Sequence, residues 1–274
     1  MRWIATAPAL GLALLIGAWP PAAANATTGG GARAADAAVA ASRSAIGRQL
    51  GDFRFTDTTR RARSLADYRG RPLLVSLVYT GCTDACPLIV RNLHPAIEIA
   101  QEALGVDSFA VVTVGFDSRA DTPERMRAFA RRMGADLPNW DFLSADRATI
   151  DALADQLGFT FFPSSAGFDH MAQVSVVDAA GRVRAQVYGG AFEPPAIVEP
   201  LKGLVFSRDL PLASIDGLIN RVRLFCTIYD PRSGRYTFDY SLFVGIFVGA
   251  GCLGLVGAVL VREWRRTRRA GRAA

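Results

Sequence analysis

Residues 71–87 read "RPLLVSLVYTGCTDACP", an apolar run that leads into two cysteines and a proline. The aliphatic and β-branched residues at 71–80 predict a strand that is covered on both faces. Apolar residues then recur at roughly helical spacing: Leu88, Ile89, Leu93, Ile97 and Leu104. They predict a helix from about Cys86 to Leu104, so the cysteine pair lies where a buried strand passes into a helix.

The surrounding sequence predicts the other elements of one α/β domain. They are a second buried strand at 109–116, helices at 121–134 and 146–158 that each end in glycine, a hairpin at 172–189 and a closing helix at 193–206. The order β-α-β-α-α-β-β-α is typical of layered α/β folds with short crossovers. We therefore expect a thioredoxin-like domain, a central mixed sheet flanked by helices, over residues 50–207.

The N-terminal residues 1–26 have the anatomy of a secretory signal peptide. They contain one arginine, an apolar run, the adjacent prolines Pro20 and Pro21 and the small residues of an A-x-A cleavage site. The alternative is an uncleaved anchor, but the apolar run is short for a membrane span. Residues 27–49 are rich in alanine and glycine with few large apolar side chains, which predicts a flexible or partly helical linker.

A second apolar stretch near the C-terminus is expected to cross the membrane as a helix over residues 240–261. The 21 residues at 241–261 carry no charge, and a spanning helix needs about 20. The aromatic residues just before it suit a membrane interface: Tyr236, Phe238 and Tyr240. The tail at 262–274 has six arginines and one glutamate, so the positive-inside rule places this tail in the cytoplasm. We therefore expect a single-pass anchor in the inner membrane, with the globular domain in the periplasm.

A connector at 208–239 joins the domain to this helix. Its apolar residues lie on one helical face: Ile215, Leu218, Ile219, Val222 and Phe225. They predict a helix packed on the domain, with a helix at the lipid surface as the alternative. Cys226 is interpreted as a free thiol, and a weaker hypothesis makes it a redox sensor at the membrane. Cys252 is interpreted as a small residue within the membrane span.

The net charge of +6 is concentrated at the two ends of the chain. The C-terminal tail accounts for +5 and Arg2 for +1, which leaves residues 3–261 with no net charge. Without a net positive charge this region has no basic surface for a phosphate backbone, so we exclude nucleic acid as a partner. The basic tail is a topology signal with some attraction to anionic lipid.

Cys82 and Cys86 can serve as a disulfide, a redox dithiol or two metal ligands. A cysteine in the first turn of a helix is stabilised as a thiolate, and Pro87 fits there because its missing N–H costs nothing. Residues four apart are neighbours on one helical face, within bridging distance. A structural disulfide would close a loop too short to stabilise much. Redox proteins of this fold normally use C-x-x-C, and the extra residue here favours a metal chelate.

The chain has two histidines, and they are not equivalent. His94 lies in mid-helix before Pro95 and is interpreted as structural. His170 precedes the hairpin strand that should lie beside the strand leading to Cys82, so its imidazole can approach both sulfurs. Two thiolates and one imidazole suit Cu(I), or Cu(II) with an added donor, whereas structural zinc requires a fourth protein ligand.

Three motifs in this order resemble those of the Sco/SenC family of membrane-tethered copper proteins, which serve cytochrome c oxidase assembly. They are "YTGCTDACP" at 79–87, "VGFDSRADTPERM" at 114–126 and "FDHMAQVSVVDAAGRV" at 168–183. The resemblance covers roughly residues 51–206. It implies that Cys82, Cys86 and His170 bind copper and that the cysteine pair can also cycle between dithiol and disulfide.

The resemblance implies a metallochaperone that receives copper from an upstream donor. It would deliver copper to the binuclear centre in subunit II of cytochrome c oxidase. The alternative is a thiol-disulfide oxidoreductase that keeps the acceptor cysteines reduced and carries no copper. Two features depart from the family pattern: many members have an N-terminal anchor rather than a C-terminal one, and Met171 replaces a small polar residue.

Overall fold

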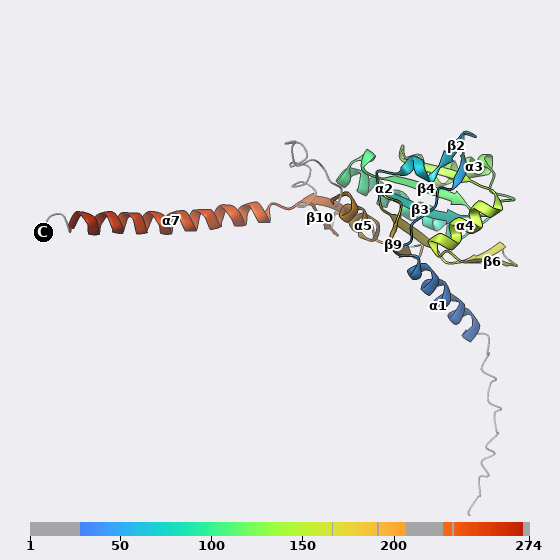
Figure 1. Ribbon diagram of the computed structural model, residues 1–274, viewed down its shortest axis with the longest axis horizontal. Helices are drawn as coiled ribbons and strands as arrows, with labels where there is room; N and C mark the ends of the chain where they lie inside the picture. Colours follow the sequence, from blue (N-terminus) through green and yellow to red (C-terminus); the bar gives the residue numbers. More distant parts are fainter. Residues whose placement is uncertain (1–27, 166, 191, 207–226, 232, 271–274) are drawn as a thin grey trace, which may run out of the picture.

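The computed structural model describes residues 28–165, 167–190, 192–206, 227–231 and 233–270 (Figure 1). A mixed sheet of seven strands forms the centre of the globular part. Its strands in sheet order are β2 (Ala62–Ser64), β1 (Arg54–Asp57), β5 (Trp140–Ser144), β4 (Ala110–Gly115), β3 (Leu73–Val78), β8 (Gln173–Val177) and β9 (Val183–Tyr188). This architecture confirms the predicted α/β fold with a central mixed sheet.

The two central strands explain why the core lies where it does. β3 and β4 run parallel, with Leu73 beside Ala110 and Val78 beside Gly115, and every residue of both strands is buried. β8 pairs antiparallel with the other edge of β3. Strands buried on both faces read as continuous apolar runs, which is why the sequence predicted both of them.

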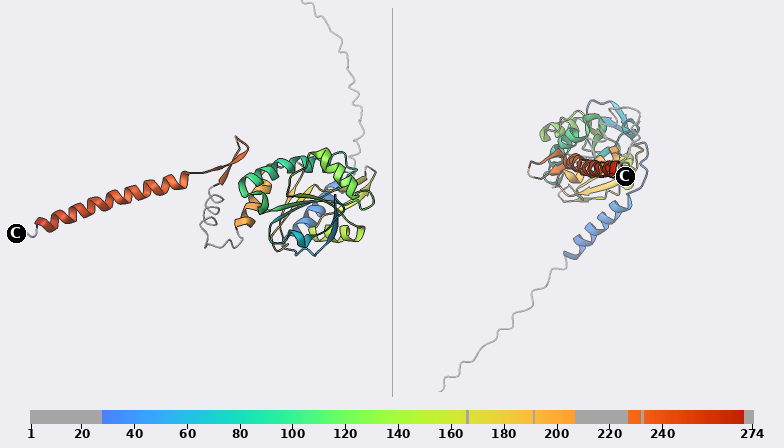
Figure 2. Two further views of the ribbon diagram at one scale, coloured as in Figure 1. Left: turned by 90° about the horizontal axis from the view of Figure 1, so that it is seen from above. Right: turned by 90° about the vertical axis from the view of Figure 1, so that its left-hand side faces the viewer.

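Helices cover the sheet on both faces, with α2 and α3 on one side and α4 on the other (Figure 2). The helices of the globular part are α2 (Ala85–Leu104), α3 (Pro123–Met133), α4 (Arg147–Leu157) and α5 (Pro195–Phe206), with short 3-10 turns η1 (Leu65–Tyr68) and η2 (Val106–Ser108). Thr122 caps α3 and Asp146 caps α4 through side-chain oxygens that accept backbone N–H groups. Both helices end at a left-handed glycine, as predicted.

The predicted order was wrong in one central place, because β5 lies between the two helices α3 and α4. Its sequence is only five residues long and includes Asp141, which interrupts the apolar run. The Asp141 carboxylate accepts a hydrogen bond from the Tyr68 hydroxyl at 2.7 Å, so a tertiary contact accommodates the charge. The short strands β1 and β2 were also missed, as was a two-stranded arm made of β6 (Phe161–Ser164) and β7 (Gly167–His170).

The segment before the domain forms a helix, α1 (Thr28–Ser44). Ser42 and Ala45 are fully buried, so the packed region extends upstream of the predicted boundary at residue 50. The close approach of the Ala41 carbonyl to Gly158 leaves no room for a side chain at that glycine. The predicted signal peptide at residues 1–26 lies outside the described residues.

After α5, the described chain continues as a hairpin of β10 (Thr227–Asp230) and β11 (Arg235–Phe238) and then as the long helix α7 (Ser241–Ala270). One helix of the described part, over Ser241–Arg262, is long and apolar enough to cross a membrane, and none of its most apolar window is buried. It projects away from the globular part (Figure 1). The helix predicted at 215–225 and Cys226 lie outside the described residues.

One aromatic residue of the predicted interface belt, Tyr236, also contacts the globular part. The Tyr236 hydroxyl donates a hydrogen bond to Glu199 Oε1 of α5 at 2.8 Å, and the Lys202 ammonium lies 5.9 Å from the centre of its ring. Phe238 and Tyr240 instead contact each other, with ring centroids 4.7 Å apart. Tyr236 therefore joins the hairpin to the globular part.

Candidate metal centre

The two thiols lie at the junction of β3 and α2, as the sequence predicted. The chain turns after β3, with the Cys82 amide donating to the Tyr79 carbonyl at 3.1 Å. Asp84 occupies the N-cap of α2 but makes no side-chain capping bond. Sulfur atoms accept backbone N–H groups here instead: Cys86 donates to Cys82 Sγ at 3.3 Å, and Tyr79 donates to Cys86 Sγ at 3.4 Å. These bonds fix both sulfurs on one side of the turn.

His170 reaches the thiols from the β6–β7 arm. Its Nε2 atom lies 3.4 Å from Cys86 Sγ, and the ligand atoms of Cys82, Cys86 and His170 all lie within 4.8 Å of one another. Its Nδ1 atom lies 3.3 Å from the Met171 carbonyl oxygen. An Nδ1–H tautomer donates to that carbonyl and leaves the Nε2 lone pair directed at the sulfurs, which is the arrangement that a metal-binding imidazole needs.

The two thiols differ in their electrostatic surroundings. Burial raises the pKa of Cys82, but the hydrogen bonds that its sulfur accepts from the backbone N–H groups of Cys86 and Asp84 outweigh burial and leave the pKa below its usual value. Burial raises the pKa of Cys86 far above its usual value, and the neighbouring Cys82 sulfur adds to that rise. Cys82 is therefore the sulfur that ionises first.

Burial also determines the protonation state of the third candidate ligand, His170. It lowers the pKa of His170, and the Met171 carbonyl and the Asp169 carboxylate only partly oppose this effect. The imidazole is therefore neutral at pH 7, as a metal ligand must be. Three aromatic rings surround it, with centroids 5.8 Å away for Tyr79, 5.3 Å for Phe116 and 5.7 Å for Phe159.

A buried carboxylate supports the turn that leads to Cys82. Asp121 Oδ1 accepts hydrogen bonds from the amide and the hydroxyl of Thr80 at 2.8 and 2.7 Å, and its other oxygen accepts the Asp117 amide at 2.9 Å. Burial raises the pKa of Asp121, which the bonds from Thr80 oppose. Gly115 makes this packing possible, because a Cβ there would lie 2.5 Å from the Asp121 Cβ.

Four residues of the site were not predicted from the sequence: Tyr79, Phe116, Phe159 and Asp121. A signal for two of them was present, since Tyr79 and Phe116 each directly follow a central strand at the edge where the cysteines lie. Phe159 lies just before β6, in a region where the sequence predicted no strand. Its position beside the imidazole depends on the path of the arm and not on any local pattern.

The other candidate residues lie away from this centre. The imidazole of His94 lies near carboxylates, with Nδ1 3.5 Å from Glu98 and Nε2 3.9 Å from Asp136, and its ring lies 6.2 Å from that of Trp140. These contacts agree with a structural role. Cys252 is exposed on α7.

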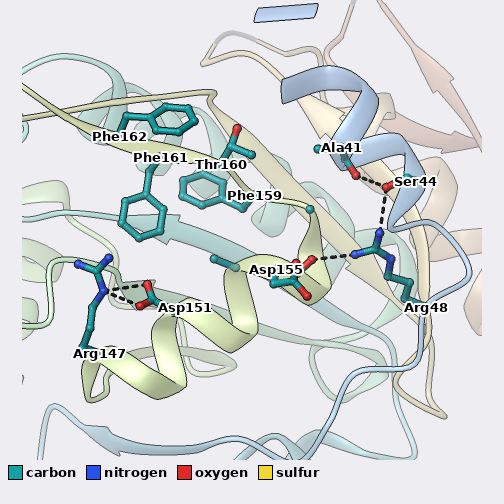
Figure 3. Close-up of a pocket in the computed structure, with 12 residues that line it drawn as sticks. Ala41, Ser44, Arg48, Arg147, Asp151, Asp155, Phe159, Thr160, Phe161 and Phe162 are labelled. Carbon is teal, nitrogen blue, oxygen red and sulfur yellow. Dashed lines mark hydrogen bonds and ion pairs between the residues drawn. The ribbon is translucent and has the colours of Figure 1, made fainter. Parts of the chain in front are cut away.

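Two cavities border the arm. One, of about 320 Å³, is lined by Phe159, Phe161 and Phe162 together with α1 and α4 (Figure 3). The Arg147 guanidinium lies 5.6 Å from the centre of the Phe161 ring at this cavity and pairs with Asp151 at 2.7 Å. The other, of about 350 Å³, lies between α1 and the arm, and its lining includes the following residues of the arm and its exit: Phe162, Asp169, His170 and Met171.

The sequence model of the SCO1/SenC family matches residues 42–205. The chain belongs to the SCO1/SenC family. The match includes the cysteine pair, His170 and all seven strands of the central sheet, and it agrees with the resemblance seen in the three motifs.

Solved structures agree with this family fold. A protein of Aquifex aeolicus VF5 is 26% identical over 61% of this chain and 97% of its own, with a TM-score of 0.53. BsSco, described with a disulfide switch and as a member of the Sco family of cytochrome c oxidase assembly proteins, is 18% identical over 60% and 96%, with a TM-score of 0.53. Yeast Sco1, solved with copper bound, is 16% identical over 60% and 92%, with a TM-score of 0.50.

Proposed function

We propose that this SCO1/SenC protein binds copper and delivers it to the binuclear copper centre in subunit II of cytochrome c oxidase. The observation that carries the proposal is the cluster of Cys82, Cys86 and His170, whose ligand atoms lie within 4.8 Å of one another. Two relatives support it, since yeast Sco1 was solved with copper and BsSco is named as an oxidase assembly protein.

The donor set fits copper by its chemistry. Two thiolates and a neutral imidazole are soft ligands that suit trigonal Cu(I), and an added donor would complete a site for Cu(II). Cys86 is fully buried, whereas Cys82 is 9% exposed. An incoming ligand would therefore reach the copper on the side of Cys82, while Cys86 keeps its position in the core.

Transfer proceeds by exchange of one ligand at a time. An acceptor cysteine loses its proton as its sulfur binds Cu(I), and the Cys82 sulfur leaves and takes up a proton. A second acceptor cysteine then loses its proton as its sulfur replaces His170, and Cys86 leaves last and takes up that proton. No electron moves, so copper keeps its oxidation state and the proton count is unchanged.

The same proposal includes a location. A signal peptide at residues 1–26 would direct export, and α7 would anchor the chain in the inner membrane with its basic tail in the cytoplasm. The copper site would then lie in the periplasm, where an upstream donor loads it and where subunit II presents its copper centre.

A second candidate function is thiol-disulfide exchange, and the contrast between the two thiols favours it. The pKa of Cys82 is lowered and that of Cys86 raised, as expected for an attacking and a resolving cysteine. The Cys82 thiolate would attack an acceptor disulfide, and one acceptor thiolate would leave. Cys86 would then attack Cys82 and give its proton to the second leaving thiolate. Two electrons pass to the acceptor, and an external thiol must reduce the new Cys82–Cys86 disulfide.

His170 separates the two functions, because thiol exchange needs no imidazole. We expect His170→Ala in the full chain to abolish copper loading of the oxidase in cells and to leave disulfide reduction in vitro intact. His94→Ala is the matched control, since it removes the other histidine from a structural position, and it should retain both activities. Normal oxidase loading by His170→Ala would contradict the chaperone proposal.

A further inference from the structure

The arm that carries His170 has few backbone ties to the rest of the domain. β6 and β7 pair with each other from Phe161 and His170 to Ser164 and Gly167. Within the described residues, neither strand pairs with the seven-stranded sheet. Main-chain hydrogen bonds therefore set the shape of the arm, and side-chain packing must set its position over the thiols.

The outer side of the arm supplies little of that packing. Two cavities of about 320 and 350 Å³ border the arm. Phe162, which points to the outer side, is 62% exposed. An apolar side chain that borders empty space on one side makes few dispersion contacts there, so the outer side gives the arm little to rest against.

The inner side of the arm packs on the rings of Tyr79, Phe116 and Phe159, and of these Phe116 contacts the most rings of the arm. The centroid of the Phe116 ring lies close to those of five other rings: Phe161 at 4.8 Å, His170 at 5.3 Å, Tyr79 at 5.3 Å, Phe168 at 5.4 Å and Phe159 at 5.5 Å. Both strands of the arm and the ligand imidazole therefore contact the same side chain. Ring pairs at such separations have tilted or edge-to-face geometries that favour one relative orientation.

Phe116 is itself fixed to the centre of the fold. It directly follows β4, and its amide donates to the Val78 carbonyl at 2.8 Å, which continues the pairing of the two central strands. Its ring is only 1% exposed. The ring thus fixes the position of the imidazole relative to the edge of the sheet at which the cysteines lie.

We infer that Phe116 is the positioning residue of the metal centre: its ring holds the β6–β7 arm against the sheet edge and keeps His170 Nε2 within bonding reach of both thiols. The copper readout of this inference rests on the proposed function. The placement of the imidazole does not, and it can be measured without metal.

The test compares Phe116→Leu with Phe129→Leu in the full chain in detergent micelles. Phe129 is a matched control because it is also 1% exposed, and its described ring contacts are with Phe142 and Arg132 rather than with the arm. Leucine keeps an apolar side chain at each position, so both variants should fold. Phe116→Ala and Phe129→Ala extend the comparison where they fold.

The first measurement is the rate at which diethyl pyrocarbonate modifies each histidine of the metal-free chain. His94 is the internal reference, because the chain has only two histidines. We expect Phe116→Leu to raise the rate at His170 several-fold and to leave His94 unchanged, and Phe129→Leu to change neither. Equal protection of His170 in wild type and Phe116→Leu would overturn the inference, whatever the copper result.

The second measurement is the Cu(II) affinity and the nitrogen hyperfine coupling of the bound copper. Loss of a group that orients a metal ligand typically weakens binding about 10–100-fold, and we expect Phe116→Leu to fall in this range with weakened nitrogen coupling. Phe129→Leu should bind as wild type does. If wild type binds no copper, the proposed function fails while the modification rates still decide the inference. If Phe116→Leu binds as tightly as wild type with unchanged coupling, the inference fails and the proposed function stands.

Discussion

The two sides of the metal centre are built differently. The thiol side belongs to the core, where Cys86 is fully buried at the start of α2 and both sulfurs accept backbone N–H groups. The imidazole side belongs to a short arm that borders cavities and has no strand pairing to the main sheet among the described residues. One side is fixed by the fold itself, and the other is held by aromatic packing.

This difference suits a protein that must first hold a metal and then give it up. The rigid placement of the sulfurs sets the geometry of the site, and their thiolate chemistry sets the preference for a soft ion. An imidazole on an arm can withdraw by a small movement, so that a second acceptor ligand can replace it after the first has replaced Cys82. The comparison predicts that changes on the thiol side weaken copper binding most, that changes on the imidazole side also weaken it, and that changes away from both sides affect stability alone.

The largest effect is expected from Cys86→Ser. Removing a buried soft ligand should weaken Cu(I) binding by more than about a hundredfold, beyond the cost of losing a group that only orients a ligand. Competition with a chromogenic Cu(I) chelator measures the affinity. Cys252→Ser, in the apolar helix α7, is the control and should bind as wild type does. Retention of wild-type affinity by Cys86→Ser would contradict the assignment of the thiol side.

The next effect concerns the support beneath the thiol side. A methyl group at Gly115 would lie 2.5 Å from the Asp121 Cβ and 2.8 Å from Met126 Sδ. Gly115→Ala should therefore lower the free energy of unfolding by about 1–3 kcal/mol, as overpacking of a core does. Chemical denaturation measures the change. Gly203→Ala, at an exposed helical position with no atom within 4 Å, should raise stability by about 0.5–1 kcal/mol; equal effects would count against the packing argument.

A smaller effect on stability is expected from Asp57, which lies in β1 near the edge of the sheet. Burial alone would raise the pKa of Asp57, but hydrogen bonds from the Thr59 hydroxyl and amide and from the Arg61 amide outweigh it and lower that pKa. The lowered pKa means that Asp57 stabilises the fold above the unfolded pKa of about 4 and that this contribution is lost as the pH falls through the folded value.

Asp57→Asn should accordingly lower stability by about 1–2 kcal/mol at pH 7, and the difference from wild type should shrink below about pH 4. Unfolding measured from pH 2.5 to 7 tests this, with the exposed Asp107→Asn as control. Copper affinity at pH 7 should not change. A stability difference between Asp57→Asn and wild type that grows as the pH falls would contradict this prediction.

The smallest effect is expected where the hairpin meets α5. Tyr236→Phe removes the hydroxyl that donates to Glu199 and keeps the ring that packs near Lys202. One partly exposed hydrogen bond contributes about 0.5–1.5 kcal/mol, so the unfolding transition should shift little. Copper affinity should stay at the wild-type value. A large loss of copper binding in this variant would show that the hairpin supports the metal centre.

The sequence predicted the thiol side well, because that side follows from local patterns. The run of apolar residues before Cys82, the helical spacing after Cys86 and the capping residue Thr122 each specify an element without help from distant parts of the chain. The same is true of the family motifs, which supplied the expected ligand set.

The imidazole side was only partly predictable. His170 was chosen because its strand should lie next to the one before Cys82, and β8 does pair with β3. The arm itself is two strands of four residues that pack on Tyr79 and Phe116, both 45 or more positions away along the chain. Short segments held by distant rings carry no periodic signal, and the same reason explains why β5 with its Asp141 was missed.

The most direct test of the central claim is X-ray absorption at the copper edge of the full chain loaded with one Cu(I). The claim is that both thiolates and the His170 imidazole bind the same ion. We expect two sulfur neighbours and one nitrogen with imidazole scattering in wild type and in His94→Ala, and loss of that nitrogen in His170→Ala. Sulfur neighbours alone in wild type, or identical spectra for wild type and His170→Ala, would contradict it.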